Sequence, residues 1–204
     1  MSTLFSQLRI GLIALLLLVA ACSPLQQQPT PNQPNWAAHQ QQLSELRDWY
    51  IVGKLGIRTQ QQSNSARFNW QQQQQQFDIR VTNLLGQNLA TLIGTPNQVQ
   101  LDIAGKDRYV TSQPELFLQQ QLGWSLPVNM LNHWIKGIPA PDSQANYQLN
   151  DQGLLQNLSQ AGWQVNFSRY QSLESHTLPS KIRLQQGDIA LTLLIKRWNL
   201  PAHQ

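Results

Sequence analysis

Residues 66–82 read ARFNWQQQQQQFDIRVT, and this stretch decides the fold class. On both sides of the glutamines, large apolar residues alternate with polar ones: Phe68, Trp70, Phe77, Ile79 and Val81. A repeat of two is typical of antiparallel strands that bury one face. The stretch therefore predicts two strands joined as a hairpin.

The six glutamines Gln71–Gln76 allow two interpretations. One makes them an element for interaction or aggregation, as in other glutamine-rich tracts. The other, which we favour, places them in the connection of the hairpin, where added length costs little free energy.

The same alternation continues on both sides of this stretch. Its apolar positions are Ile51, Leu55 and Ile57, then Leu89, Thr91 and Ile93, then Val99, Leu101 and Ile103, and later Tyr147, Leu149, Leu154–Leu158, Trp163, Val165, Phe167, Ile182, Leu184, Ile189, Leu191, Leu193 and Ile195. The chain should thus be mainly β, a largely antiparallel sheet of roughly ten strands. A sheet of that size must curl, split or close.

Three helices are predicted beside the strands. Asn35 suits the cap of a helix over residues 36–47. Ser112 and Glu115 fit a capping box for a short helix that ends at Gly123. The third helix has the usual boundary residues, Pro127 and Gly137. The last two could cover one face or the mouth of the sheet.

The N-terminal residues 1–21 have the order of a secretory signal peptide: Arg9, an apolar run, then small residues. The run is too short to cross a bilayer core of about 30 Å. Val19-Ala-Ala-Cys22 resembles the lipobox of bacterial lipoproteins, in which the cysteine becomes N-acylated and carries an S-diacylglycerol. The alternative is an ordinary signal cleaved after Ala21, which leaves an unused thiol. In the lipoproteins that the motif resembles, Ser23 in place of aspartate points to the outer membrane.

The composition of the remaining chain limits its possible functions. Residues 22–35 are rich in proline and glutamine and predict a flexible tether, and residues 36–204 predict one domain. Charged residues make up 12% of the chain and its cations are mostly single, so no nucleic-acid partner is indicated. One cysteine allows no intrachain disulfide. The four histidines lack metal-ligand spacing and no cofactor or catalytic motif occurs, so we expect no metal, no cofactor and no enzyme activity.

The segment Thr82–Gln87, TNLLGQ, departs from the usual chemistry of a hairpin tip. Leu84 and Leu85 stand between the turn residues Asn83 and Gly86, where polar residues are expected. Either both leucines are exposed, or one enters the core through a register shift. An exposed apolar tip on a membrane-tethered domain would suggest contact with a membrane or an acyl chain.

Together with the lipobox and the tether, four segments resemble the LolB family, the outer-membrane lipoprotein receptors of the Lol sorting pathway: RDWYIVG at 47–53, ARFNWQ at 66–71, TNLLG at 82–86 and LPVNMLNHWIKGIP at 126–139. The resemblance implies an incompletely closed β-barrel with helices over a hydrophobic cavity. It also implies a monomer that accepts acylated lipoproteins from the periplasmic carrier LolA and inserts them into the inner leaflet of the outer membrane. The protruding leucine of the family's loop falls on Leu85, and Leu84 stands where the family has proline.

Nine inward-facing residues are candidates for lining that cavity, although for each of them alone we favour a place in the ordinary core: Phe68, Trp70, Phe77, Ile79, Val81, Val99, Leu101, Trp163 and Phe167. Two other functions stay open at this point. A structural lipoprotein would bind an envelope partner through its sheet edge. A periplasmic hydrolase would need titratable groups clustered in a pocket.

Overall fold

The structure, a computed structural model, describes residues 35–123, 126–173 and 175–201. In order, these residues form α2 (Trp36–Glu45), β1 (Asp48–Arg58), β2 (Ser63–Gln73), β3 (Gln76–Thr82), β4 (Asn88–Thr95), β5 (Gln98–Ile103), β6 (Arg108–Thr111), α3 (Pro114–Leu122), α4 (Val128–Trp134), β7 (Ala145–Leu149), β8 (Leu155–Gln160), β9 (Trp163–Leu173), β10 (His176–Gln186) and β11 (Ile189–Asn199). The predicted signal peptide, Cys22 and all of the tether except Asn35 lie outside the described residues.

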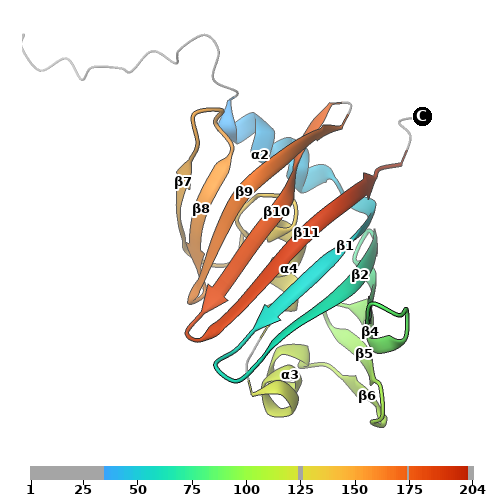
Figure 1. Cartoon of the computed structure of the whole chain (residues 1–204). Helices are drawn as coiled ribbons and strands as arrows, with labels where there is room; N and C mark the ends of the chain where they lie inside the picture. Colours follow the sequence, from blue (N-terminus) through green and yellow to red (C-terminus); the bar gives the residue numbers. More distant parts are fainter. Residues whose placement is uncertain (1–34, 124–125, 174, 202–204) are drawn as a thin grey trace, which may run out of the picture. The chain divides into compact units, whose positions relative to one another are not determined.

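The strands make one antiparallel sheet in the order β6-β5-β4-β3-β2-β1-β11-β10-β9-β8-β7. β1 pairs with β11, so the first and last strands of the sheet meet at its centre. β6 and β7 form the two edges and do not pair with each other, which leaves the sheet open. Figure 1 shows the strands curling around one side of the molecule. The predicted open antiparallel fold is confirmed.

The inner face of the curled sheet carries the core, because alternate residues of each strand point inward. In β1 and β2 these include Trp49, Ile51, Phe68 and Trp70, all less than 7% exposed. Gly53 allows the close approach of Phe68, since a β-carbon at Gly53 would lie 2.7 Å from its Cε1.

The helix α2 crosses one end of the sheet. Asn35 Oδ1 accepts the backbone N–H of Ala37 at 3.1 Å, so the predicted cap is confirmed. Trp36 Nε1 donates to the hydroxyl of Tyr147 on β7, and Gln42 Nε2 donates to the Ser175 carbonyl in the β9–β10 turn. Within the described part of the chain, no helix is long and apolar enough to cross a membrane.

Only Gln74 and Gln75 of the glutamine tract form the predicted connection, and the other four glutamines belong to strands, which corrects the rest of our prediction. Gln71 to Gln73 belong to β2 and Gln76 begins β3, so the turn needs only two residues. Asp48 fixes that turn by accepting from the backbone N–H and the side-chain Nε2 of Gln74 at 2.8 and 2.9 Å. Gln72 is only 3% exposed and has a structural role in the core.

The register of β4 was also predicted wrongly. Leu92 points inward, whereas Leu89 and Ile93 are 40% and 41% exposed. The physical reason is an irregularity in the pairing between Val81 and Thr82, which shifts the register by one residue. Because β4 has apolar residues on both faces, the sequence pattern does not indicate this shift.

Two further elements depart from the sequence prediction. The capping box at Ser112 does not form: Gln113 stands at the N-cap of α3, and its backbone N–H donates to Thr111 Oγ1 at 3.0 Å. The short strand β6 was not predicted, because its four residues, among them exposed Arg108 and Val110, lack a clear apolar face.

Candidate functional site

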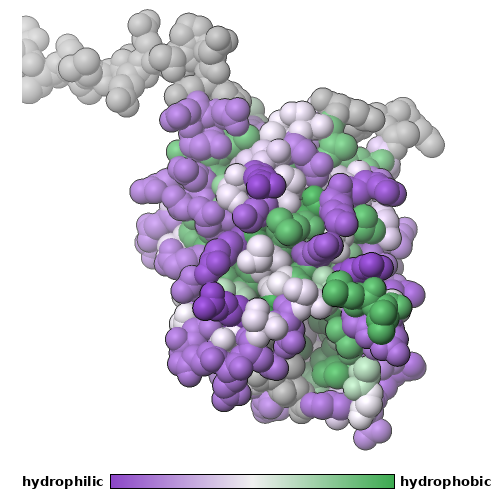
Figure 2. Space-filling model, viewed as in Figure 1, coloured by the Kyte–Doolittle hydropathy of each residue, from purple (hydrophilic) through white to green (hydrophobic). Residues whose placement is uncertain are grey.

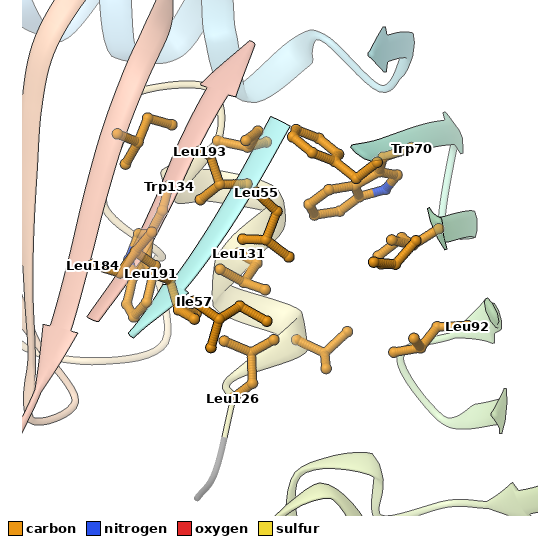
Figure 3. Close-up of a pocket in the computed structure, with 16 residues that line it drawn as sticks. Leu55, Ile57, Trp70, Leu92, Leu126, Leu131, Trp134, Leu184, Leu191 and Leu193 are labelled. Atoms are coloured by element: carbon orange, nitrogen blue, oxygen red, sulfur yellow. The ribbon is translucent and has the colours of Figure 1, made fainter. Parts of the chain in front are cut away.

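An apolar cavity of about 130 Å³ lies between the inner face of the sheet and α4. Figure 3 shows its leucines and tryptophans pointing toward one another from the strands and from the helix. All sixteen lining side chains are hydrocarbon or indole: Leu55, Ile57, Phe68, Trp70, Ile79, Val81, Leu92, Leu126, Val128, Leu131, Trp134, Ile135, Ile182, Leu184, Leu191 and Leu193. A site of this composition favours a hydrocarbon ligand and rejects charged or strongly polar groups.

The ring nitrogens of the two lining tryptophans donate hydrogen bonds to side chains outside the cavity lining. Trp70 Nε1 donates to Gln72 Oε1 at 3.1 Å, and Trp134 Nε1 donates to Gln160 Oε1 at 2.8 Å. Buried indole N–H groups need a partner, and here the partners are glutamines that do not line the cavity. Two large aromatic rings therefore line the cavity, and neither leaves its N–H group without a hydrogen-bond partner.

Gln160 also fixes the segment that follows α4. Its Nε2 donates to the carbonyls of Ala140 and Ser143 at 2.7 and 2.8 Å, while its Oε1 accepts the Ala140 N–H at 3.0 Å. The side chain is 2% exposed and fully used in hydrogen bonding. One amide of β8 thus holds both a cavity-lining ring and the backbone next to it.

The chain reverses sharply after α4 at Gly137, whose φ is 81°. A β-carbon at this position would lie 3.0 Å from Pro179 Cγ and 3.2 Å from the Tyr170 hydroxyl. Both the backbone conformation and the close packing therefore require glycine. This reversal lets α4 end against β9 and β10.

The β3–β4 loop exposes both of its leucines. Leu85 is 86% exposed and Leu84 is 55% exposed, so neither enters the core. Asn83 orders the loop, because its Oδ1 accepts the backbone N–H groups of Leu85 and Gln87 at 2.9 and 3.0 Å. Figure 2 shows a hydrophobic cluster at this place on a largely hydrophilic face. We call Leu84 and Leu85 the leucine tip.

The structure divides the nine predicted lining residues into two groups. Phe68, Trp70, Ile79 and Val81 line the cavity, whereas the rest are buried in the core away from its lining: Phe77, Val99, Leu101, Trp163 and Phe167. A role in binding acyl chains stays a prediction for all of them.

Sequence reasoning missed the contributions of α4, β10 and β11 to the cavity lining, and also those of β1 and of Leu92 on β4. The apolar face of α4, with Val128, Leu131 and Trp134, was the available signal, but a buried helix face indicates core as readily as cavity.

Two buried titratable groups outside the cavity lining, Lys136 and Tyr170, each donate a hydrogen bond to a backbone carbonyl. Lys136 is 3% exposed and its Nζ donates to the Leu46 carbonyl at 3.2 Å. Burial, and secondarily the charge of Arg47, lowers the pKa of Lys136 to about 8. Burial raises the pKa of Tyr170, whose hydroxyl donates to the Leu155 carbonyl. Among the described residues, no group of three or more His, Cys, Asp or Glu could hold a metal ion.

Solved structures share this fold at very low sequence identity. A LolA superfamily protein from Nitrosomonas europaea matches with a TM-score of 0.53 at 4% identity, covering 82% of this chain and 94% of that one. A DUF1329 family protein from Desulfovibrio piger matches with a TM-score of 0.58 at 8% identity, covering 83% and 92%. These likenesses concern the fold alone.

Sequence comparison gives the family. The profile described as "Outer membrane lipoprotein LolB" matches residues 47–198. A protein named Outer-membrane lipoprotein LolB from Pseudomonas fluorescens is 42% identical over 82% of both chains. Another of that name, from Stutzerimonas stutzeri, is 39% identical over 90% of this chain and 91% of its own. The chain belongs to the LolB family of outer-membrane lipoproteins.

Proposed function

We propose that this protein receives acylated lipoproteins from the periplasmic carrier LolA and inserts them into the inner leaflet of the outer membrane. It does so as a monomer, without catalysis or an energy source, while anchored to the outer membrane of a Gram-negative bacterium by lipid on Cys22 and facing the periplasm. The observation that carries the proposal is the cavity between the sheet and α4, whose sixteen lining side chains are all apolar.

Acyl chains suit this cavity energetically. Each buried methylene contributes about 0.8 kcal/mol, so a chain leaves its carrier only toward a site that shields it comparably well. Transfer from carrier to receptor to bilayer then needs only a downhill order of affinities.

The cavity volume of about 130 Å³ indicates that the site must widen when cargo enters. An engineered protein cavity of about 150 Å³ holds one benzene, and an acyl chain is several times larger. The sheet walls are hydrogen-bonded strands, so the parts of the lining that are free of the sheet's ladder are α4 and its neighbours Leu126 and Ile135. Displacement of α4 is therefore the expected opening motion.

The leucine tip would release the chains into the membrane. Leu85→Glu should leave the fold and the acceptance of cargo intact, because Leu85 is 86% exposed and does not line the cavity. Insertion into outer-membrane vesicles should fail. Leu116→Glu on α3 is the matched control, since Leu116 is also an exposed leucine, at 48%.

The decisive experiment follows a radiolabelled acylated lipoprotein from its carrier to this protein, with a non-acylated form as control. Movement of the acylated form alone supports a receptor for acyl chains. If both forms bind equally, or if neither form binds, the cavity is not a receptor site for acyl chains. If Leu85→Glu inserts cargo normally, the leucine tip has no role in insertion.

A further inference from the structure

A row of cations crosses the outer face of the sheet along the register of its hydrogen bonds. Arg169 on β9 is opposite Lys181 on β10, which is opposite Leu194 on β11. Leu194 is in turn opposite Lys54 on β1, and Lys54 is opposite Arg67 on β2. We call Lys54, Arg67, Arg169 and Lys181 the cationic row.

The charges of the cationic row are not neutralised within the described residues. The ion pairs found there join Arg80 to Asp78 at 2.8 Å and Arg108 to Asp102 at 3.4 Å. No carboxylate lies within 4.0 Å of a row cation in the same part of the chain. Lys54, Arg67 and Arg169 are exposed and Lys181 is partly exposed, so these charges face solvent.

The cationic row ends at the leucine tip. Arg67 is opposite Thr82, the last residue of β3, and the loop with Leu84 and Leu85 begins at the next residue. Leu194 adds a leucine, 38% exposed, within the row. In the view of Figure 1, α4 lies behind the strands, and Figure 2 shows a hydrophobic cluster on the face that is turned toward the viewer. Fixed cations and apolar side chains are therefore presented together.

We propose that the cationic row and the leucine tip form one docking surface for the anionic phospholipid head groups of a bilayer. Lysine and arginine are attracted to an anionic leaflet within about a Debye length, while leucine gains from reaching the acyl region. A free phosphate would use the cations but not a leucine that is 86% exposed beside them. The combination fits a lipid surface.

The length of the tether agrees with this docking. Thirteen residues, Ser23–Asn35, separate the predicted lipid anchor from the first helix. At about 3.5 Å per residue they reach at most about 45 Å, so the start of α2 stays within that distance of the leaflet that holds the anchor. This docking rests on the proposed function and adds to it the lipid class that the receptor recognises.

The test measures binding of the mature chain, with Cys22→Ala to remove the anchor, to two kinds of vesicle. One is phosphatidylcholine alone, and the other contains phosphatidylglycerol as one lipid in four. The unchanged surface should bind the anionic vesicles more tightly. The double variant Lys54→Gln/Arg67→Gln should lose about tenfold in partition coefficient on anionic vesicles and almost nothing on neutral ones.

Two control variants separate the cationic row from net charge and from misfolding. Arg47→Gln/Arg58→Gln removes the same charge at the two ends of β1 and should lose less than about twofold. Lys54→Arg/Arg67→Lys keeps the charge and should bind as the parent does. Equal losses from the two glutamine pairs, or no preference of the parent for anionic vesicles, would overturn the proposal; the second result would point to an acidic protein as the partner.

Failure of this docking is distinguishable from failure of the proposed function. Neither Lys54 nor Arg67 lines the cavity that is proposed to accept the acyl chains, so Lys54→Gln/Arg67→Gln should accept cargo from the carrier in solution normally. Normal acceptance with unchanged vesicle binding overturns the docking surface alone. If the parent chain accepts no cargo, the receptor function fails, whatever the vesicles show.

Discussion

The indole Nε1 of Trp134 lies 2.8 Å from Oε1 of Gln160. Trp134 is part of α4 and lines the cavity, whereas Gln160 ends β8 and lies outside the lining. The bond orients a ring of the cavity from a strand that does not itself contribute to the cavity wall. The ring of Trp163 lies next to that of Trp134, at a centroid distance of 6.5 Å.

Gln160→Leu should therefore weaken the attachment of α4 as well as the fold. The change leaves the Trp134 N–H and the polar backbone groups of Ala140 without their partner, in a region that is almost fully buried. We expect the free energy of unfolding in urea to fall by about 2 to 3 kcal/mol. Gln156→Leu, an exposed glutamine on the same strand, is the control and should change it by less than about 0.5 kcal/mol. Equal effects would contradict the role of Gln160.

The free energy of unfolding should increase as the pH rises above neutrality, because Lys136 loses its proton. Its pKa in the folded chain is about 8, below the ordinary 10.5, so the unfolded chain binds more protons between these values. Stability then increases with pH across this window, by on the order of 1–2 kcal/mol between about pH 7 and 9.5. Urea unfolding at both pH values measures the gain.

Lys136→Met should abolish this pH-dependent gain. The variant loses the hydrogen bond to the Leu46 carbonyl but removes a buried cation. A gain of the same size in the variant would show that another group titrates in this window.

The sequence predicted the strands well where one face is apolar and the other polar. Phe68, Trp70, Ile79 and Val81 all point inward as expected, because polar residues flank each of them. The prediction for β4 was wrong because this strand has apolar residues on both faces: Leu89, Ala90, Leu92 and Ile93. Only the irregular pairing at Thr82 decides which face points inward.

The cavity was predictable only in part, because it depends on how α4 lies over the sheet. A local pattern shows that Trp134 is buried, but not that its ring faces a space rather than packed side chains. The bond to Gln160 spans 26 residues and has no local signal. The leucine tip was predictable from the sequence because its two leucines stand where a turn usually has polar residues.

His39 on α2 should make the protein less stable in acid. Burial, and then the nearby charge of His176, lowers the pKa of His39 below 6.5, so the unfolded chain takes up the proton more readily. Stability should fall as the pH drops through this range. His39→Gln should reduce the loss between about pH 7.5 and pH 5, measured by urea unfolding. Some loss should remain, because burial lowers the pKa of His133 as well. A variant with an unchanged pH profile would assign the whole effect to other groups.

Leu92→Trp should obstruct the cavity without harming the sheet. Leu92 points from β4 into a space of about 130 Å³, and an indole would occupy much of it. Affinity for an acylated cargo should fall by about tenfold, the equivalent of losing about two methylenes at 0.8 kcal/mol each. Leu89→Trp is the matched control, because Leu89 lies on the same strand but is 40% exposed on the outer face. It should bind cargo normally. Normal binding by Leu92→Trp as well would mean that acyl chains occupy another part of the molecule, whereas a loss in Leu89→Trp alone would contradict the register of β4.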